Sequence, residues 1–399
     1  MRRLLTTVFL AGLLSATAVA RVAAQDLVIT NARIIVGNGQ VIERGSVVVR
    51  AGRIASMAAG APAAQPGAQT IDAGGMTVMA GFIDAHRHIM QGNAEQWFKE
   101  RAAVRLQEFF DAGYTTLMEG GGQIPGTMQL KEKIEKGELK GPRIITSARA
   151  DPSDYKTEEE ARARVRQIKQ AGVDIVKARI EPPADPKEVA MLTIVGDEAR
   201  QQKIGLMVHA VSPQAMVAAV KAGATKLVHT PHNGWLTQAD IKVVKDAGIP
   251  MLSTIGFGVP VFGVFNKDNK PTFRDGKPWP EAVQNGIGDG REAGEKAVNG
   301  RMVWDAGVVY GFGTDTGYLP KDGLAHELKA LNLVYSPQDI IKLMGPNTAA
   351  FIDKPDRGTV EAGKLADLVI LNGNPLDGYW NLLNTKVTIK GGVIVTDKR

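Results

Sequence analysis

The sequence predicts an α/β protein: a (β/α)8 barrel of the TIM type, with a small composite β-sandwich domain built from both chain ends. Three observations indicate this fold. β-like runs punctuated by Gly, Asn and Pro occupy both ends of the chain. Between them, strand-like and helix-like segments alternate over roughly 270 residues. Finally, several apolar runs of this middle part end in His, Lys or Asp.

The two ends of the chain share one character. β-like runs cover residues 26–37, 46–57 and 69–81 near the N-terminus, and 366–373 and 386–397 near the C-terminus. Because these ends flank a different middle, we expect residues 25–79 and 356–399 to form one composite β domain. Residues 80–355 would then form the barrel.

Residues 1–24 have the pattern of a signal peptide. A basic start precedes an apolar core at 4–14, and small residues lead to a cleavage site near Ala24. The core is shorter than the roughly 20 apolar residues that a membrane span needs. We therefore expect the leader to be removed, leaving a periplasmic or secreted protein with no membrane attachment.

Composition narrows the function classes. The chain has 399 residues, of which 44% are hydrophobic and 23% charged, enough for one large and one small domain. Three arginines of the leader account for half of the formal net charge of +6, and no basic block predicts a nucleic-acid partner. With no cysteine, any metal must be held by nitrogen and oxygen ligands.

The middle part supplies the barrel elements in order. Helices are predicted at 95–111, 158–172, 187–202, 212–223 and 237–247, and another ends at 306; Thr157 and Glu160 have capping-box spacing. The alternative is a doubly wound open sheet, but no G-x-G-x-x-G stands at a strand–helix turn. The segment 255–289 is long for a connection and could be a lid, a substrate wall or a solvated insertion.

The ends of the predicted strands carry the most informative residues. "GFIDAHRH" ends in His86 and His88, and "VDIVK" ends in Lys177. "LMVH", "KLVH" and "YGFGTD" end in His209, His229 and Asp315. Side chains alternate along a strand, so His86 and His88 should both face the barrel axis and suit chelation of one metal, whereas Arg87 points away. Barrels carry their chemistry at this end, so the joint pattern predicts a metal site.

These motifs resemble the metal-dependent amidohydrolase superfamily, in its prolidase-like, imidazolonepropionase-related and ochratoxinase-like branch. The matching stretches run in the family's order over most of the chain: "AGFIDAHRH", "VDIVKARI", "LMVHA", "KLVHT", "YGFGTD" and "RGTVEAGKLADLVILNGNPL". Two stretches depart from the family pattern. Arg87 is bulky for its position between two histidines, and "KLMGPNTAAFI" is a loose version of the helix after the barrel.

The resemblance implies a site with two divalent metal ions, usually zinc. His86 and His88 would bind one ion, His209 and His229 the other, and a carbamylated Lys177 would bridge them. Asp315 would bind the first metal and act as the catalytic proton acceptor. A metal-bridging hydroxide would then attack the carbonyl of the substrate, and Asp315 would pass the proton to the leaving amine.

The favoured function is hydrolysis of an amide or peptide bond in a small molecule, a dipeptide or an N-acyl amino acid. The alternatives are a cyclic-amide or lactone hydrolase similar to imidazolonepropionase, and a catalytically inactive scaffold. The sequence leaves the roles of two further histidines undecided. His232 is a weaker candidate for substrate binding, and His326 is a candidate for a structural hydrogen bond. A homo-oligomer is also open, because members of the family often assemble.

Overall fold

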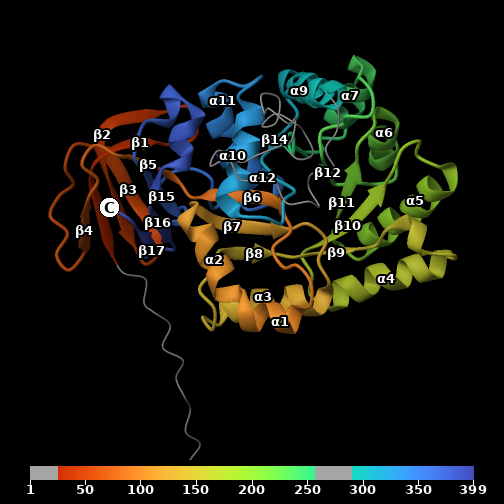
Figure 1. Cartoon of the computed structure of the whole chain (residues 1–399), viewed down its shortest axis with the longest axis horizontal. Coiled ribbons are helices and arrows are strands. Elements are labelled where there is room, and N and C mark those ends of the chain that lie inside the picture. Colours follow the sequence, from red (N-terminus) through yellow and green to blue (C-terminus); the bar gives the residue numbers. More distant parts are fainter. Residues whose placement is uncertain (1–25, 257–289) are drawn as a thin grey trace, which may run out of the picture.

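The computed structural model describes residues 26–256 and 290–399, and it contains a helix-covered barrel with a β-sheet beside it (Figure 1). The predicted signal peptide, and most of the segment 255–289, lie outside the described residues. No helix in the described ranges is long and apolar enough to cross a membrane.

The barrel wall consists of parallel strands in sequence order. They are β6 (Phe82–Arg87), β7 (Tyr114–Glu119), β8 (Arg143–Ile145), β9 (Ser147–Arg149), β10 (Ile175–Ile180), β11 (Gly205–Ala210), β12 (Lys226–Val228), β13 (Met251–Leu252) and β14 (Tyr310–Gly311). β8 pairs with β7 and β9 pairs with β10, and only Thr146 separates them. β8 and β9 thus act as two halves of one strand, which makes eight positions around the wall.

Hydrogen bonds between the last and the first strand close the ring. The Ala85 N–H donates to Phe312 O at 3.1 Å, and the Asp315 N–H donates to His86 O at 2.8 Å. This closure confirms the (β/α)8 barrel and excludes the open, doubly wound sheet. It also places the segment after β14 directly beside the histidine pair.

Helices surround the barrel and cover the apolar side of its wall. They are α1 (Ala94–Glu100), α2 (Ala102–Asp111), α3 (Ile124–Glu135), α4 (Glu158–Gln170), α5 (Pro186–Gln201), α6 (Pro213–Lys221), α7 (Gln238–Asp246), α9 (Gly290–Asp305), α10 (Pro320–Leu331), α11 (Pro337–Lys342) and α12 (Thr348–Phe351). The predicted helix 95–111 is two helices, divided at Arg101, whose φ of −123° is not helical. The predicted capping box is present: the Glu160 N–H donates to Thr157 Oγ1, and the Thr157 N–H donates to the Glu160 carboxylate.

The composite domain is built from both chain ends, as the sequence predicts. Its strands are β1 (Leu27–Ile35), β2 (Val41–Arg50), β3 (Arg53–Ala59), β4 (Gln69–Asp72), β5 (Thr77–Ala80), β15 (Leu368–Leu371), β16 (Thr385–Lys390) and β17 (Val393–Asp397). They hydrogen-bond as one eight-stranded sheet, in which the antiparallel pair β5–β15 joins the two ends. This sheet has an apolar core of its own.

Polar contacts from β16 and from the residue before β15 attach the sheet to the barrel. Asp367 accepts two hydrogen bonds from the Arg143 guanidinium, at 2.9 and 3.1 Å, and Thr388 Oγ1 donates to Phe110 O at 2.6 Å. The loose family segment 342–352 comprises the end of α11, a π-helical turn η3 (Leu343–Asn347) that contains Pro346, and α12.

Candidate metal centre

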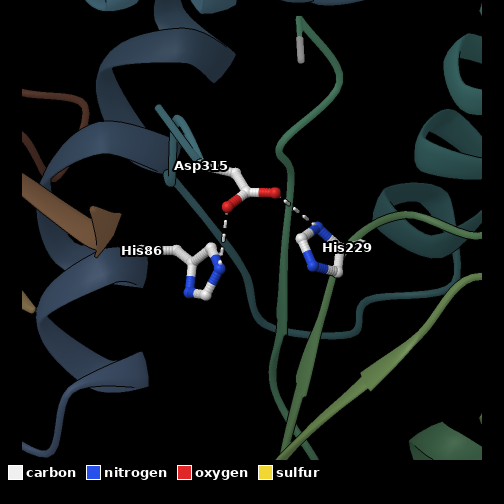
Figure 2. Close-up of side chains that lie close together, drawn as sticks. All are labelled: His86, His229 and Asp315. Carbon is white, nitrogen blue, oxygen red and sulfur yellow. Dashed lines mark ion pairs between the residues drawn. The ribbon is translucent and has the colours of Figure 1, made fainter. Parts of the chain in front are cut away.

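Three of the predicted ligands converge at the C-terminal end of the barrel strands. His86 lies on β6, His229 follows β12, and Asp315 follows β14 (Figure 2). Each offers a ligand atom, and these atoms all lie within 4.8 Å of one another. His86 Nε2 is 3.1 Å from Asp315 Oδ1, and His229 Nδ1 is 3.8 Å from Asp315 Oδ2.

The other three predicted residues line the same cavity, which has a volume of about 550 Å³. His88 Nε2 is 3.0 Å from Asp315 Oδ1, so His86 and His88 do face the same side of their strand. The ring of His209, on β11, has its centroid 4.3 Å from that of His229. Lys177, on β10, is buried and lies between Arg149 and Met207 in the strand register.

Burial keeps two of the imidazoles neutral. It lowers the pKa of His86 to about 3, with help from the charge of Lys177, and it lowers the pKa of His229 well below the ordinary value. Burial also lowers the pKa of His88, but hydrogen bonds to Asp315 and Glu119 outweigh it and raise that pKa to about 9. A neutral imidazole has the lone pair that a metal ion needs.

The site also shifts the pKa values of Asp315 and Lys177. Burial alone would raise the pKa of Asp315, but the neighbouring imidazoles of His86 and His229 outweigh it and hold that pKa well below its ordinary value. Asp315 is therefore a carboxylate. Burial lowers the pKa of Lys177 to about 8, so a larger fraction of its amine is neutral than in an exposed lysine.

The backbone is strained where these residues sit. His229, Thr254 and Asp315 have positive φ values of 77°, 41° and 52°, which non-glycine residues rarely adopt. The strain is held in place by contacts such as the 2.8 Å hydrogen bond between His229 Nδ1 and Thr254 Oγ1. Strain of this kind persists where surrounding structure enforces it, and it clusters at functional sites.

The donor set fits a divalent cation. It combines imidazole nitrogens with a carboxylate oxygen, the ligands that zinc takes in the absence of cysteine. His86 Nδ1 is also buried without a hydrogen-bond partner among the described residues. The His86 ring is therefore not fully engaged by hydrogen bonds and can bind an ion.

Arg87 has a structural place that the sequence did not predict. Its guanidinium is fully buried under the site and stacks over Phe109 at 5.2 Å. It donates hydrogen bonds to Thr314 Oγ1, at 3.1 Å, and to Thr316 Oγ1 and Tyr318 O. Arg87 therefore holds both residues that flank Asp315.

Arg149, Asp151 and Arg179 also line the cavity, together with Gln91 and Tyr318. Sequence reasoning missed them. Alternation along the strand "VDIVKARI" could have indicated Arg179, which is two residues after Lys177 on the same face. For Asp151, Gln91 and Tyr318, which lie outside regular strands, no comparable signal exists.

The two open histidines lie away from the metal ligands. His232 Nδ1 contacts Thr230 O at 3.1 Å, and its Nε2 is 3.5 Å from Glu292 Oε1 on α9; the ring is not part of the cavity lining. His326 Nδ1 shares a 2.7 Å hydrogen bond with the Tyr318 hydroxyl, which agrees with the predicted structural role.

Comparison with known proteins identifies the class of this site. The model of the amidohydrolase family matches residues 77–395, so the chain belongs to that family. It is a metal-dependent hydrolase that acts on C–N bonds, and the ligand atoms of His86, His229 and Asp315 lie close enough together to hold a metal ion. No curated protein matches the chain by sequence.

Solved structures share the fold. A protein from Bifidobacterium longum, provisionally assigned as a prolidase, is 24% identical, with a TM-score of 0.78 over 94% of this chain and 97% of that one. A Xaa-Pro dipeptidase with methionine bound in its active site is 24% identical (TM-score 0.75; 93% and 99% covered). The ochratoxinase of A. niger is 18% identical (TM-score 0.73; 94% and 96% covered).

Proposed function

We propose that this protein is an exported, binuclear amidohydrolase that cleaves the amide bond of a dipeptide or an N-acyl amino acid. The observation that carries the proposal is the meeting of six side chains, from five strands or the residues just after them, on one cavity. The prolidase, the Xaa-Pro dipeptidase and the ochratoxinase among the structural neighbours support a small substrate with an amide bond.

The residues present suit two ions. His86, His88 and Asp315 would hold one, His209 and His229 the other, and a carbamate on Lys177 would bridge them. When bound, the metal pair would polarise the scissile carbonyl and make water a nucleophile at neutral pH. The depressed pKa of Lys177 favours the carbamate, because carbon dioxide reacts with the neutral amine.

Asp315 is placed to move the proton. Its carboxylate is ionised, faces the cavity and contacts His86 and His88, so it can accept a proton from the attacking water. Passing that proton to the nitrogen of the leaving group would complete the cleavage of the amide bond. Removal of the leader at residues 1–24 would release the enzyme to the periplasm or the medium.

The test is a screen of dipeptides and N-acyl amino acids with zinc-loaded protein, with and without a chelator. We expect hydrolysis that the chelator removes and added zinc restores. Two metal ions per chain and a modified Lys177 should accompany full activity. Turnover of cyclic amides or lactones alone, with one metal per chain, would instead support the imidazolonepropionase-like alternative.

A further inference from the structure

Two arginines face the cavity beside the predicted metal ligands. In the register of the parallel strands, Arg149 on β9 is the partner of Lys177, and Arg179 on β10 is the partner of His209. Partners in neighbouring strands point to the same face, as do residues i and i+2 of one strand. Arg179 therefore lies one step beyond Lys177 toward the mouth of the barrel, and both arginines line the cavity.

The donors of both guanidiniums are largely unused. The Arg149 and Arg179 side chains are 49% and 47% exposed, and neither donates a hydrogen bond to another residue of the described ranges. The carboxylates of Asp151 and Glu181 stand 3.5 Å away from them. A guanidinium has five N–H donors in a fork that matches a carboxylate.

The contrast with a structural arginine is clear within this chain. Arg143 makes two hydrogen bonds, at 2.9 and 3.1 Å, to the buried Asp367 and so ties the sheet to the barrel. Arg149 and Arg179 have no such bidentate partner in the part of the chain that the structure describes. Their position and open donors suit a ligand in the cavity better than a role in stability.

We propose that Arg149 and Arg179 form an anion subsite that binds the free carboxylate of the substrate while its amide carbonyl lies over the metal ligands. The inference rests on the proposed function and assigns the residues that would recognise the carboxylate next to the scissile bond. Charge-assisted hydrogen bonds from a guanidinium to a carboxylate are among the stronger polar contacts, so the enzyme prefers the carboxylate to the matched carboxamide.

The experiment compares N-acetyl-L-methionine with N-acetyl-L-methionine amide, using zinc-loaded wild type, Arg149→Gln, Arg179→Gln and the double variant. Arg200→Gln, on the exposed side of α5, is the matched control. The wild type should favour the carboxylate in kcat/KM. Each cavity variant should reduce that preference by about tenfold or more, mainly through KM, while the control keeps it.

Calorimetric binding of N-acetyl-L-methionine to the same zinc-loaded proteins, each carrying Asp315→Asn to suppress turnover, provides a readout that does not require hydrolysis. Weaker binding in the cavity variants, with zinc content and circular dichroism unchanged, supports the subsite. Equal binding in wild type and variants, or an equal loss for carboxylate and carboxamide, overturns it. If wild type hydrolyses neither compound nor any other amide, the proposed function fails, and the binding result still decides the subsite.

Discussion

At the residue scale, Asp315 is the centre of the site: one of its oxygens faces both His86 and His88, and the other faces His229. Its left-handed backbone directs the side chain into the cavity from the end of β14. The residues on either side, Thr314 and Thr316, are held by Arg87. Arg87 thus helps to fix the position of the Asp315 carboxylate.

Replacing Asp315 by Asn should retain most of the bound metal, because the amide still offers an oxygen, but remove most turnover. General base catalysis contributes about 10²–10⁴-fold, and kcat should fall by that order. Metal content per chain and steady-state kinetics check this. Asp305→Asn, on the exposed side of α9, is the control, and near-normal turnover in Asp315→Asn would end the assigned role.

Lys177 should respond to pH as a buried amine. Its pKa is lowered to about 8, so at a fixed concentration of dissolved carbon dioxide the neutral, reactive fraction rises as pH passes upward through about 8. We expect a carbamate signal in ¹³C NMR with labelled bicarbonate that grows over this range. The signal should be absent in Lys177→Ala, and a signal of equal size in that variant would rule out Lys177 as the modified residue.

Arg87→Met should destabilise the barrel. Burial raises the pKa of Asp84, and the charge of Arg87 offsets this in part. Removing the cation leaves the buried Asp84 with hydrogen bonds from His86 and Thr314 but without a compensating charge, and loss of one partner of a buried charge pair costs about 3–5 kcal/mol. Urea denaturation measures the loss. Adding Asp84→Asn should cost less than the sum of the two single changes, because the groups interact; strict additivity would contradict the coupling.

At the scale of elements, α9 supports the loop that follows β12. Asn299 accepts a hydrogen bond from the Leu236 N–H and donates to Pro231 O and Gly234 O, at 2.9–3.0 Å. The Glu295 carboxylate accepts the Gly234 N–H at 3.1 Å. Since this loop begins directly after His229, α9 contributes to the position of that imidazole.

Asn299→Ala should therefore weaken both stability and activity. It leaves buried backbone groups unsatisfied, at a cost of about 1–3 kcal/mol in the free energy of unfolding. Displacement of the loop should also lower kcat/KM. The exposed Asn332, at the end of α10, provides a control in which Ala should change neither quantity. If Asn299→Ala matches wild type in both the free energy of unfolding and kcat/KM, the loop keeps its conformation without support from α9.

At the scale of the whole molecule, the site depends on closure of the ring. β6 supplies the histidine pair, β10 to β12 supply Lys177, His209 and His229, and the segment after β14 supplies Asp315. A metal ion bound among them would cross-link strands from opposite ends of the barrel sequence. Ligand binding to the folded state alone raises the stability of the whole fold.

Chelation should accordingly lower the thermal midpoint of the protein. At a thousandfold excess of free zinc over its dissociation constant, binding contributes about 4 kcal/mol, which a chelator would remove. Differential scanning fluorimetry with and without a chelator measures the shift. His86→Ala should show a smaller shift, and an unchanged midpoint in the chelated wild type would argue against a metal bound to the folded state.

Much of this arrangement could be predicted because it depends on residues close together in the sequence. Alternation along "FIDAHRH" predicts that His86 and His88 share a face, and they do. The capping box of Thr157 and Glu160 needs only four consecutive residues. The sequence does not predict the break of the helix 95–111 at Arg101, because no Gly or Pro marks it.

By itself, the sequence determined the alternation of strands and helices, the β character of both ends and the polar residue at each strand tip, since each depends on near neighbours along the chain. Only the tertiary structure decided that Arg87 supports Asp315, that α9 braces the loop after His229, and that Arg149 and Arg179 share the cavity. These contacts join residues far apart in the sequence, and they exist only once the ring of strands has closed.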